Sequence, residues 1–186
     1  MNLHQTIRRI LNEETQKPKI LEFPSLEFFD NDPFEAWNII KKILQKKGYP
    51  PYSIDGDLDL GGKPVKSLGN LQSVGGDLDL RGTSIKSLGN LQSVDGELYL
   101  EETPIKSLGN LQSVGGYLLL GNTPIESLGN LQSVGETLDL KGTPIKSLGN
   151  LQSVGGNLDL AGTPLFKVYT EKQIRKMVNV EGDIYL

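Results

Sequence analysis

Few residues of this chain have the types and spacing that enzyme chemistry requires. The 186 residues include one histidine, His4, and no cysteine. Acid–base and nucleophilic catalysis usually employ histidine or an activated nucleophile. Because His4 falls within a predicted N-terminal helix, we expect it at the surface rather than in an active site. The absence of cysteine excludes disulfides, thiolate metal ligands and cysteine nucleophiles, and it permits a reducing compartment.

One glycine-rich stretch, from Gly56 to Lys63, superficially resembles a phosphate-binding loop. Its glycine spacing is one residue too long for such a loop, and Pro64 stands where serine or threonine would bind magnesium. Carboxylates are abundant, but they recur as copies of a repeat. Acid–base chemistry needs instead a unique pair in contrasting environments. The sequence therefore predicts a non-enzymatic protein with no cofactor and no catalytic or metal-ligating residues.

The most informative polar residues recur once per repeat, on what we expect to be the outer face of a sheet. The middle column of this face contains Asp59, Asp79, Tyr99, Leu119, Asp139, Asp159 and Tyr185. The column two residues earlier contains Asp57, Asp77, Glu97, Tyr117, Thr137, Asn157 and Asp183. Stacked like charges about 5 Å apart repel by about 0.8 kcal/mol even at the dielectric constant of water. Three interpretations stay open: an ordinary solvated surface, an acidic surface for a basic partner, or aspartates that hold divalent cations.

Uncharged side chains interrupt these acidic columns in adjacent repeats. Tyr99, Tyr117 and Leu119 stand where other repeats have acids or small polar residues. Exposed aromatic residues among charges are typical of a binding hot spot with a polar rim. That rim would comprise Asp79, Arg81, Glu97, Glu101, Asp139 and Lys141. We interpret the nine residues as a candidate patch for a protein partner. If the partner is basic, the charged rim would orient it electrostatically. The alternative is that the three uncharged residues merely interrupt a column of mutually repelling aspartates.

These columns require a repeating scaffold, and the sequence contains one. The octapeptide Ser-Leu-Gly-Asn-Leu-Gln-Ser-Val occurs unchanged five times at a constant period, beginning at Ser67, Ser87, Ser107, Ser127 and Ser147. The apolar positions of one unit are Leu78, Leu80, Ile85, Leu88, Leu91 and Val94. A single coil cannot bury so many apolar side chains, but coils stacked at about 4.8 Å form a continuous core. The sequence predicts a β-solenoid with one short parallel strand per coil.

At these positions the chain resembles the leucine-rich repeat family, in its short 20-residue bacterial and phage-like form. Leu78, Leu80 and Ile85 match the family's leucine positions, and the Gly-Thr-Pro-Ile segments are similar to repeats in phage-derived and other mobile genes. Two positions differ, since Gly75 replaces the first leucine and Thr83 replaces the ladder asparagine. Threonine has a single hydroxyl donor, so we expect thinner turn bonding and a straighter solenoid. The resemblance covers residues 55–186 and implies no catalytic residue.

We expect the N-terminal residues 1–50 to form a helical segment and cap, and residues 51–186 to form the solenoid with a terminal capping repeat. Asp32, Pro33 and Glu35 have the spacing of a helix start, and Gly48 would end that helix after Lys47. Its apolar stripe consists of Phe34, Trp37, Ile40 and Leu44. We predict that this stripe packs on the first coil, the alternative being a groove for a partner.

Two further segments are predicted to be helical. Residues Leu3 to Glu14 form an amphipathic pattern that would either pack on the cap or dock on another protein. Near the C-terminus an insertion of six residues, around Thr170 to Val178, lengthens one repeat, and Thr170 begins a helix. The chain then returns to the repeat pattern, which predicts a final strand that closes the stack.

The charge balance helps to choose among function classes. With 19 basic and 23 acidic residues the net charge is −4, which argues against direct nucleic-acid binding. No segment has the roughly 20 apolar residues that span a bilayer. Arg8 and Arg9 interrupt any secretory signal, so we expect no membrane partner and a cytoplasmic location, or a host-cell interior for a phage-encoded protein.

Three functions remain open. We predict first a protein-binding module or scaffold that uses the outer strand face. The alternatives are a self-associating structural component of an assembly, such as a virion or surface element, and an acidic nucleic-acid mimic that inhibits a DNA-binding protein.

Overall fold

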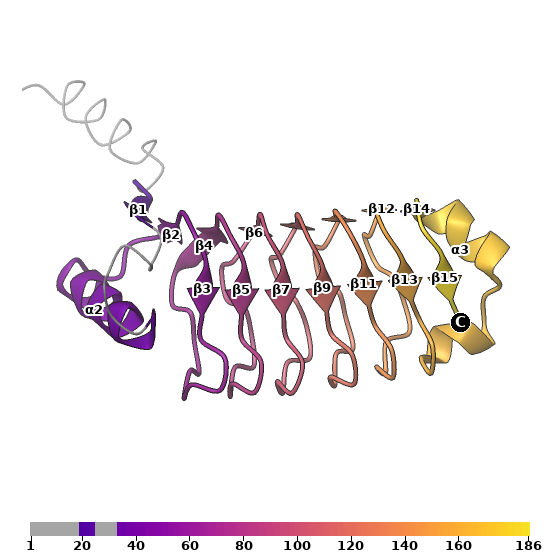
Figure 1. Cartoon of the computed structure of the whole chain (residues 1–186), viewed down its shortest axis with the longest axis horizontal. Helices are drawn as coiled ribbons and strands as arrows, with labels where there is room; N and C mark the ends of the chain where they lie inside the picture. Colours follow the sequence, from indigo (N-terminus) through magenta and orange to yellow (C-terminus); the bar gives the residue numbers. More distant parts are fainter. Residues whose placement is uncertain (1–18, 25–32) are drawn as a thin grey trace, which may run out of the picture.

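A straight row of stacked coils forms most of the molecule, with a helix at each end (Figure 1). The computed structural model describes residues 19–24 and 33–186. Successive coils pair in register, so that Leu78 lies beside Leu98 and Leu98 beside Leu118. The predicted parallel β-solenoid is therefore confirmed. The predicted helix Leu3 to Glu14, with His4, lies outside the described residues.

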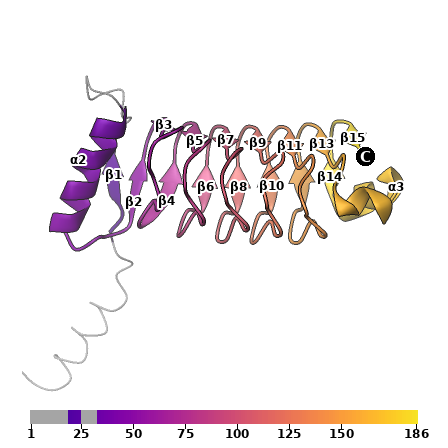
Figure 2. The same cartoon turned by 90° about the horizontal axis from the view of Figure 1, so that it is seen from below.

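Two parallel sheets run along the stack (Figures 1 and 2). Within the described residues the first sheet has eight strands, in the order β1 (Leu21–Phe23), β2 (Tyr52–Ile54), β4 (Leu71–Val74), β6 (Ser93–Val94), β8 (Ser113–Val114), β10 (Ser133–Val134), β12 (Ser153–Val154) and β14 (Asn179–Val180). The second has seven, in the order β15 (Ile184–Tyr185), β13 (Leu158–Asp159), β11 (Leu138–Asp139), β9 (Leu118–Leu119), β7 (Leu98–Tyr99), β5 (Leu78–Asp79) and β3 (Leu58–Asp59). Each coil thus has one strand more than predicted.

The additional strand comes from the end of the octapeptide. Ser93 and Val94 pair in register with Ser113 and Val114 of the next coil. This strand is only two residues long, too short for the apolar alternation by which a strand is recognised in a sequence. The sequence pattern therefore did not predict the first sheet, whereas the Leu-x-Leu alternation predicted the second.

The apolar side chains of every coil point inward and form one continuous core. Leu88 and Leu108, which hold the same place in successive repeats, are both fully buried, as predicted. The other predicted core positions of that coil are also 0 or 1% exposed; they are Leu78, Leu80, Ile85, Leu91 and Val94. The threonines at the ladder position are buried too. The Thr103 hydroxyl donates to the Leu100 carbonyl at 2.6 Å, and Thr123, Thr143 and Thr163 make the equivalent bond, whereas the Thr83 hydroxyl has no partner among the described residues.

The identical octapeptides have a structural explanation. Within a copy, the Ser87 hydroxyl oxygen accepts the Gly89 N–H at 3.1 Å. Between copies, the Asn90 side-chain amide donates to Asn70 Oδ1 and the Gln92 amide donates to Gln72 Oε1, both at 2.7 Å. At these positions identical residues of neighbouring coils bond one another. The Asn110 and Asn150 amides donate instead to the Gly89 and Gly129 carbonyls of the preceding coil. Stacked asparagines thus bond between coils at Asn70 and Asn90.

The helix α2 (Pro33–Lys46) covers the N-terminal end of the stack (Figure 2). Its buried face includes Trp37, Ile40 and Leu44, which are at most 5% exposed, and the Trp37 ring lies 6.1 Å from the Tyr52 ring. Gly48, with φ +78°, follows the helix in a left-handed conformation that suits glycine. The predicted cap helix is confirmed and begins at Pro33 as expected, although the predicted N-cap residue, Asp32, lies outside the described residues.

The C-terminal end carries the short helices η2 (Pro164–Lys167) and α3 (Glu171–Met177). Leu165 and Ile174 are the buried side chains of these helices. The Thr170 N–H donates to Gln173 Oε1 at 2.9 Å, which stabilises the helix start where the sequence predicted one. Beyond α3 the chain resumes the coil, and Ile184 and Tyr185 pair in register with Leu158 and Asp159. The six inserted residues thus form a cap without shifting the register.

Candidate functional site

The outer face of the second sheet presents one side chain of the middle column from each strand. Inward leucines such as Leu98 and Leu118 are fully buried, so the residues that follow them point outward. Parallel pairing places the middle column in strict register along the sheet, in the order Asp59, Asp79, Tyr99, Leu119, Asp139, Asp159 and Tyr185.

An open groove of about 420 Å³ follows part of this column. Its lining consists of Glu97, Tyr99, Tyr117, Leu119, Thr137, Asp139, Asn157, Asp159 and Tyr185. The structure thus brings together all three uncharged residues of the predicted patch with two of its acids, Glu97 and Asp139. A smaller hollow of about 200 Å³ adjoins it, lined by Asp59 and Asp79 among others, and Tyr99 borders both.

The remaining predicted rim residues lie beside this groove rather than in it. Arg81 stacks on Tyr99, with its guanidinium carbon 4.7 Å from the ring centre. Glu101 and Lys141 belong to the turns that follow β7 and β11; the Glu101 carbonyl accepts the Gly82 N–H at 3.2 Å. Four lining residues are additions to the predicted patch: Thr137, Asn157, Asp159 and Tyr185. The sequence placed all four in the two outward columns. Because they are polar, it did not indicate that the groove extends along them.

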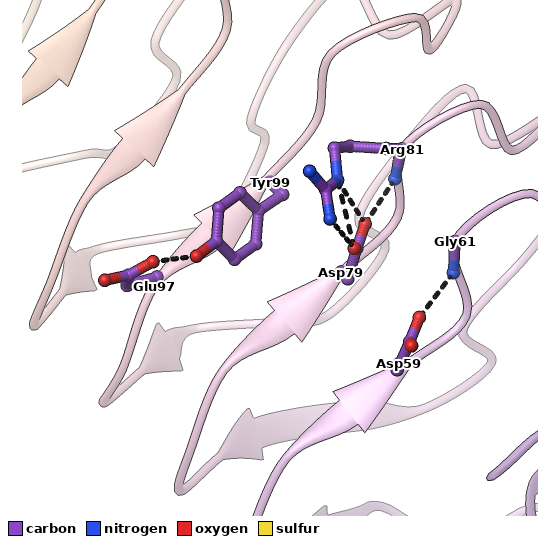
Figure 3. A network of polar contacts seen from close by, with 6 residues as sticks. All are labelled: Asp59, Gly61, Asp79, Arg81, Glu97 and Tyr99. Atoms are coloured by element: carbon purple, nitrogen blue, oxygen red, sulfur yellow. Dashed lines mark hydrogen bonds and ion pairs between the residues drawn. The ribbon is translucent and has the colours of Figure 1, made fainter.

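The aspartates of the middle column have a local structural function. Each accepts, through Oδ1, the backbone N–H two residues further on. The four bonds join Asp59 to Gly61 at 2.9 Å, Asp79 to Arg81 at 2.9 Å, Asp139 to Lys141 at 2.8 Å and Asp159 to Ala161 at 2.9 Å (Figure 3 shows the first two). This is the Asx-turn bond that favours aspartate at the start of a turn. The acidic column is therefore explained in part by turn formation.

Two adjacent coils depart from this arrangement. Leu119 cannot accept a hydrogen bond, and the Tyr99 hydroxyl donates instead to Glu97 (Figure 3). The turns of the same two coils contain Glu102 and Asn122 in left-handed conformations, both with φ +59°. Glycine occupies this left-handed turn position in the other repeats, at 62, 82, 142 and 162. The coils that carry the aromatic and aliphatic side chains thus differ from the repeat at two places each.

The Arg81 side chain shows how this face holds a cation (Figure 3). Its Nε lies 3.1 Å from Asp79 Oδ1 and 3.0 Å from Oδ2, and its Nη2 also contacts that carboxylate. At the same time the guanidinium covers the Tyr99 ring. The hydrogen bond to Asp79 raises the pKa of Arg81 above its ordinary value. A carboxylate and a tyrosine on neighbouring strands therefore form a site for one guanidinium group.

The groove itself favours positive charge. Burial, followed by the charge of Asp159, raises the pKa of Asp139, although the N–H of Lys141 opposes this shift. Burial also raises the pKa of Glu97, with a further contribution from Asp77. The pKa of Tyr117 is raised by its hydrogen bond with Glu136 and by the charge of that residue. Since these carboxylates are less easily ionised than free ones, a neighbouring cation would stabilise their charged form.

Comparison with known proteins gives no family for this chain. No family model, curated protein or solved structure matches it. Within residues 19–24 and 33–186, no group of three or more histidines, aspartates and glutamates could hold a metal ion. In the same part of the chain, no helix is both long enough and apolar enough to cross a membrane. The candidate functions must therefore be weighed on the chain's own surfaces.

Two other hollows differ from this groove in their position and in the residues that line them. One of about 500 Å³ lies on the first sheet, where identical residues of successive repeats, such as Ser113, Ser133 and Ser153, form its lining. Another, of about 620 Å³, lies between α2 and the first coil and is lined by residues that include Trp37 and Tyr52. Variation between repeats, which a specific partner surface needs, is found on the second sheet.

Proposed function

We propose that this chain is a non-enzymatic protein-binding module, and that the partner binds to the groove on the outer face of the second sheet. The observation that carries the proposal is the pair of neighbouring residues Tyr99 and Leu119. They occupy the column in which Asp59, Asp79, Asp139 and Asp159 accept a backbone hydrogen bond. Two adjacent coils have exchanged that bond for outward-facing aromatic and aliphatic side chains.

This exchange removes two features that stabilise the other coils. A hydrogen bond of this kind contributes about 0.5 to 1.5 kcal/mol to stability. A left-handed residue other than glycine costs roughly 1 to 2 kcal/mol, somewhat less for asparagine, and Glu102 and Asn122 occupy such positions in the same coils. The side chains gained are half-buried and lie on an open face, so part of their apolar surface remains in water in the free protein. A bound partner would bury them fully, which supports binding as the reason for the exchange.

The surroundings of these two residues suit a protein partner. Tyr117, 38% exposed, adds a second ring to the groove, and the carboxylates of Glu97 and Asp139 border it. An apolar centre with a charged rim is the usual arrangement of a protein hot spot. The carboxylates would repel the phosphates of a nucleic acid, which supports a protein in preference to DNA or RNA.

Affinity capture with matched variants tests the proposal. The intact chain serves as bait, beside a variant with Tyr99→Asn and Leu119→Asn. Asparagine can accept the turn N–H without adding charge, so this variant should keep the fold of the original protein. We expect it to lose a partner that the original protein retains. A control variant, Gln132→Ala, alters the opposite face and should keep that partner.

Two results would refute the proposal. One is a partner that binds the Tyr99→Asn, Leu119→Asn variant with unchanged affinity. The other is a homogeneous self-assembly of the purified chain that the variant does not disturb, measured by light scattering. That second result would support the structural alternative, in which copies of this chain form an assembly.

A further inference from the structure

A second carboxylate–tyrosine pair lies at the far end of the groove. Asp159 pairs in register with Tyr185 on the next strand, as Asp79 pairs with Tyr99. The residue two positions after Asp79 is Arg81, whereas the residue two positions after Asp159 is Ala161. The pair beside one end of the groove and the pair at its other end thus have the same acid and the same ring, but the second pair has no arginine two positions after its aspartate.

The local geometry of the two aspartates is the same. Asp159 Oδ1 accepts the Ala161 N–H at 2.9 Å, and Asp79 Oδ1 accepts the Arg81 N–H at 2.9 Å. Both carboxylates are half-buried, and both follow a fully buried leucine on a strand of the second sheet. In each case the other carboxylate oxygen takes no part in that turn bond. At Asp79 it binds the Arg81 guanidinium, with Nε at 3.0 Å from Oδ2.

The ring of the second pair is accessible. Tyr185 is 47% exposed, and together with Asp159 it lines the groove. Ala161 has only a methyl group where Arg81 has a long side chain that covers Tyr99, and no cationic side chain of the described residues stacks on Tyr185. Asp139, in register with Asp159 on the adjacent strand, adds a second carboxylate beside it. This end of the groove therefore combines negative charge with an uncovered aromatic face.

We propose that Asp159 and Tyr185 bind an arginine side chain of the protein partner, in the way that Asp79 and Tyr99 bind Arg81. The inference rests on the proposed function, because it assigns the chemistry of the partner for the same groove. Arginine fits better than lysine, since its planar guanidinium can bond a carboxylate through two N–H groups while stacking on a ring. Charge complementarity agrees, because Asp139 and Asp159 lie side by side at this end.

The probe for this site is a blocked peptide with one arginine, titrated into the full chain and followed by the NMR amide signals of Asp159 and Tyr185. A second peptide has citrulline, which keeps the shape of arginine but has no charge. We expect the arginine peptide to shift these signals, and the citrulline peptide to bind about three- to tenfold more weakly. Equal affinity of the two peptides, or no shift with either, would overturn the proposal.

Substitutions at the two carboxylate–tyrosine pairs make the test more specific. Ala161→Arg should supply the missing guanidinium within the chain and abolish binding of the peptide, whereas Ala161→Gln, similar in length but uncharged, should weaken it much less. Arg81→Ala should uncover Asp79 and Tyr99 and add a second binding site of similar affinity, reported by the amide signals of those residues. Peptide binding that survives Ala161→Arg would overturn the proposal even if the fold of both variants is intact.

Failure of the arginine site can be distinguished from failure of the proposed function. If Tyr99→Asn with Leu119→Asn releases the captured partner but Ala161→Arg does not affect either the partner or the peptide, the groove binds protein without an arginine at Asp159. If the arginine peptide binds as expected but the affinity of the partner is unchanged in both sets of variants, the guanidinium site exists and the proposed protein interface is wrong.

Discussion

Arg175 of α3 donates a hydrogen bond from Nη1 to the Val180 carbonyl oxygen at 2.7 Å. In the preceding coils the carbonyl at the equivalent position accepts a backbone N–H of the next coil. The Val134 carbonyl, for example, accepts the Gly155 N–H at 2.9 Å. Arg175 also donates from Nη2 to the Gly182 carbonyl at 2.9 Å. A single guanidinium group thus replaces two N–H groups of a following coil and terminates the hydrogen bonding of the first sheet.

Replacement of Arg175 by alanine should destabilise the C-terminal end of the solenoid. The Val180 and Gly182 carbonyls would lose their donors, and the loss is expected at about 1 to 3 kcal/mol. Urea denaturation measures it. Lys176→Ala, on the same helix and exposed, is the matched control and should change stability by less than about 0.5 kcal/mol. Equal stability of the two variants would show that the guanidinium contacts do not stabilise the end of the stack.

The interior of the stack should be sensitive to loss of volume. Leu108 is fully buried between coils, so Leu108→Ala should reduce the free energy of unfolding by about 2 to 5 kcal/mol. Chemical denaturation gives the value. An outward residue of an adjacent repeat, Lys86, serves as a control because it is exposed and its replacement by alanine removes no core contact. A loss below about 0.5 kcal/mol for Leu108→Ala would contradict the packing described above.

The helix α2 should stabilise the first coil as a cap. Trp37 is 1% exposed and its ring lies beside that of Tyr52, so Trp37→Ala should cost about 3 to 5 kcal/mol. Deletion of residues 1–50 should expose the apolar end of the solenoid and cause aggregation, which light scattering detects. A monomeric truncated chain of unchanged stability would mean that α2 is an independent appendage. Lys46→Ala, an exposed position on the same helix, is the control.

The stability of the protein should depend on pH through Asp139. Burial raises the pKa of this carboxyl in the folded state above its ordinary value of 3.8, so the folded chain holds the proton more tightly than the unfolded chain. Its contribution to stability is therefore full at lower pH and declines as the pH rises from about 3.8 through the folded-state pKa.

Asp139→Asn removes this titration while leaving an oxygen to accept the Lys141 N–H. The variant should gain stability relative to the original protein as the pH is raised from 3 to 7, measured by urea denaturation at each pH. Asp59→Asn, which alters the same column position and the same type of turn bond outside the groove, is the matched control. A difference between Asp139→Asn and the original protein that does not change with pH would exclude a raised pKa at Asp139.

The amino-acid sequence by itself determined the architecture of this protein. In a stack with a constant period, the neighbours of each residue are its own copies in the preceding and following repeats, so a local pattern also defines the long-range contacts. That is why the buried positions of Leu88 and Leu108, the outward column and the cap helix with Trp37 followed from spacing alone. The neighbouring positions of Tyr99 and Leu119 followed for the same reason.

Only the tertiary structure decided what the individual polar side chains do. The Asx-turn bond of Asp159 and the stacking of Arg81 on Tyr99 depend on side-chain directions, which the repeat period does not specify. Arg175 reaches Val180 because the six-residue insertion folds back as a helix, where the repeat pattern is interrupted. The same insertion places Asp159 and Tyr185 more than one repeat length apart in the sequence. The return of the repeat pattern had placed Tyr185 next to Asp159 in the middle column, and strand pairing confirms that these two residues repeat the relation of Asp79 to Tyr99. Only the structure shows how the inserted residues fold so that the register is kept.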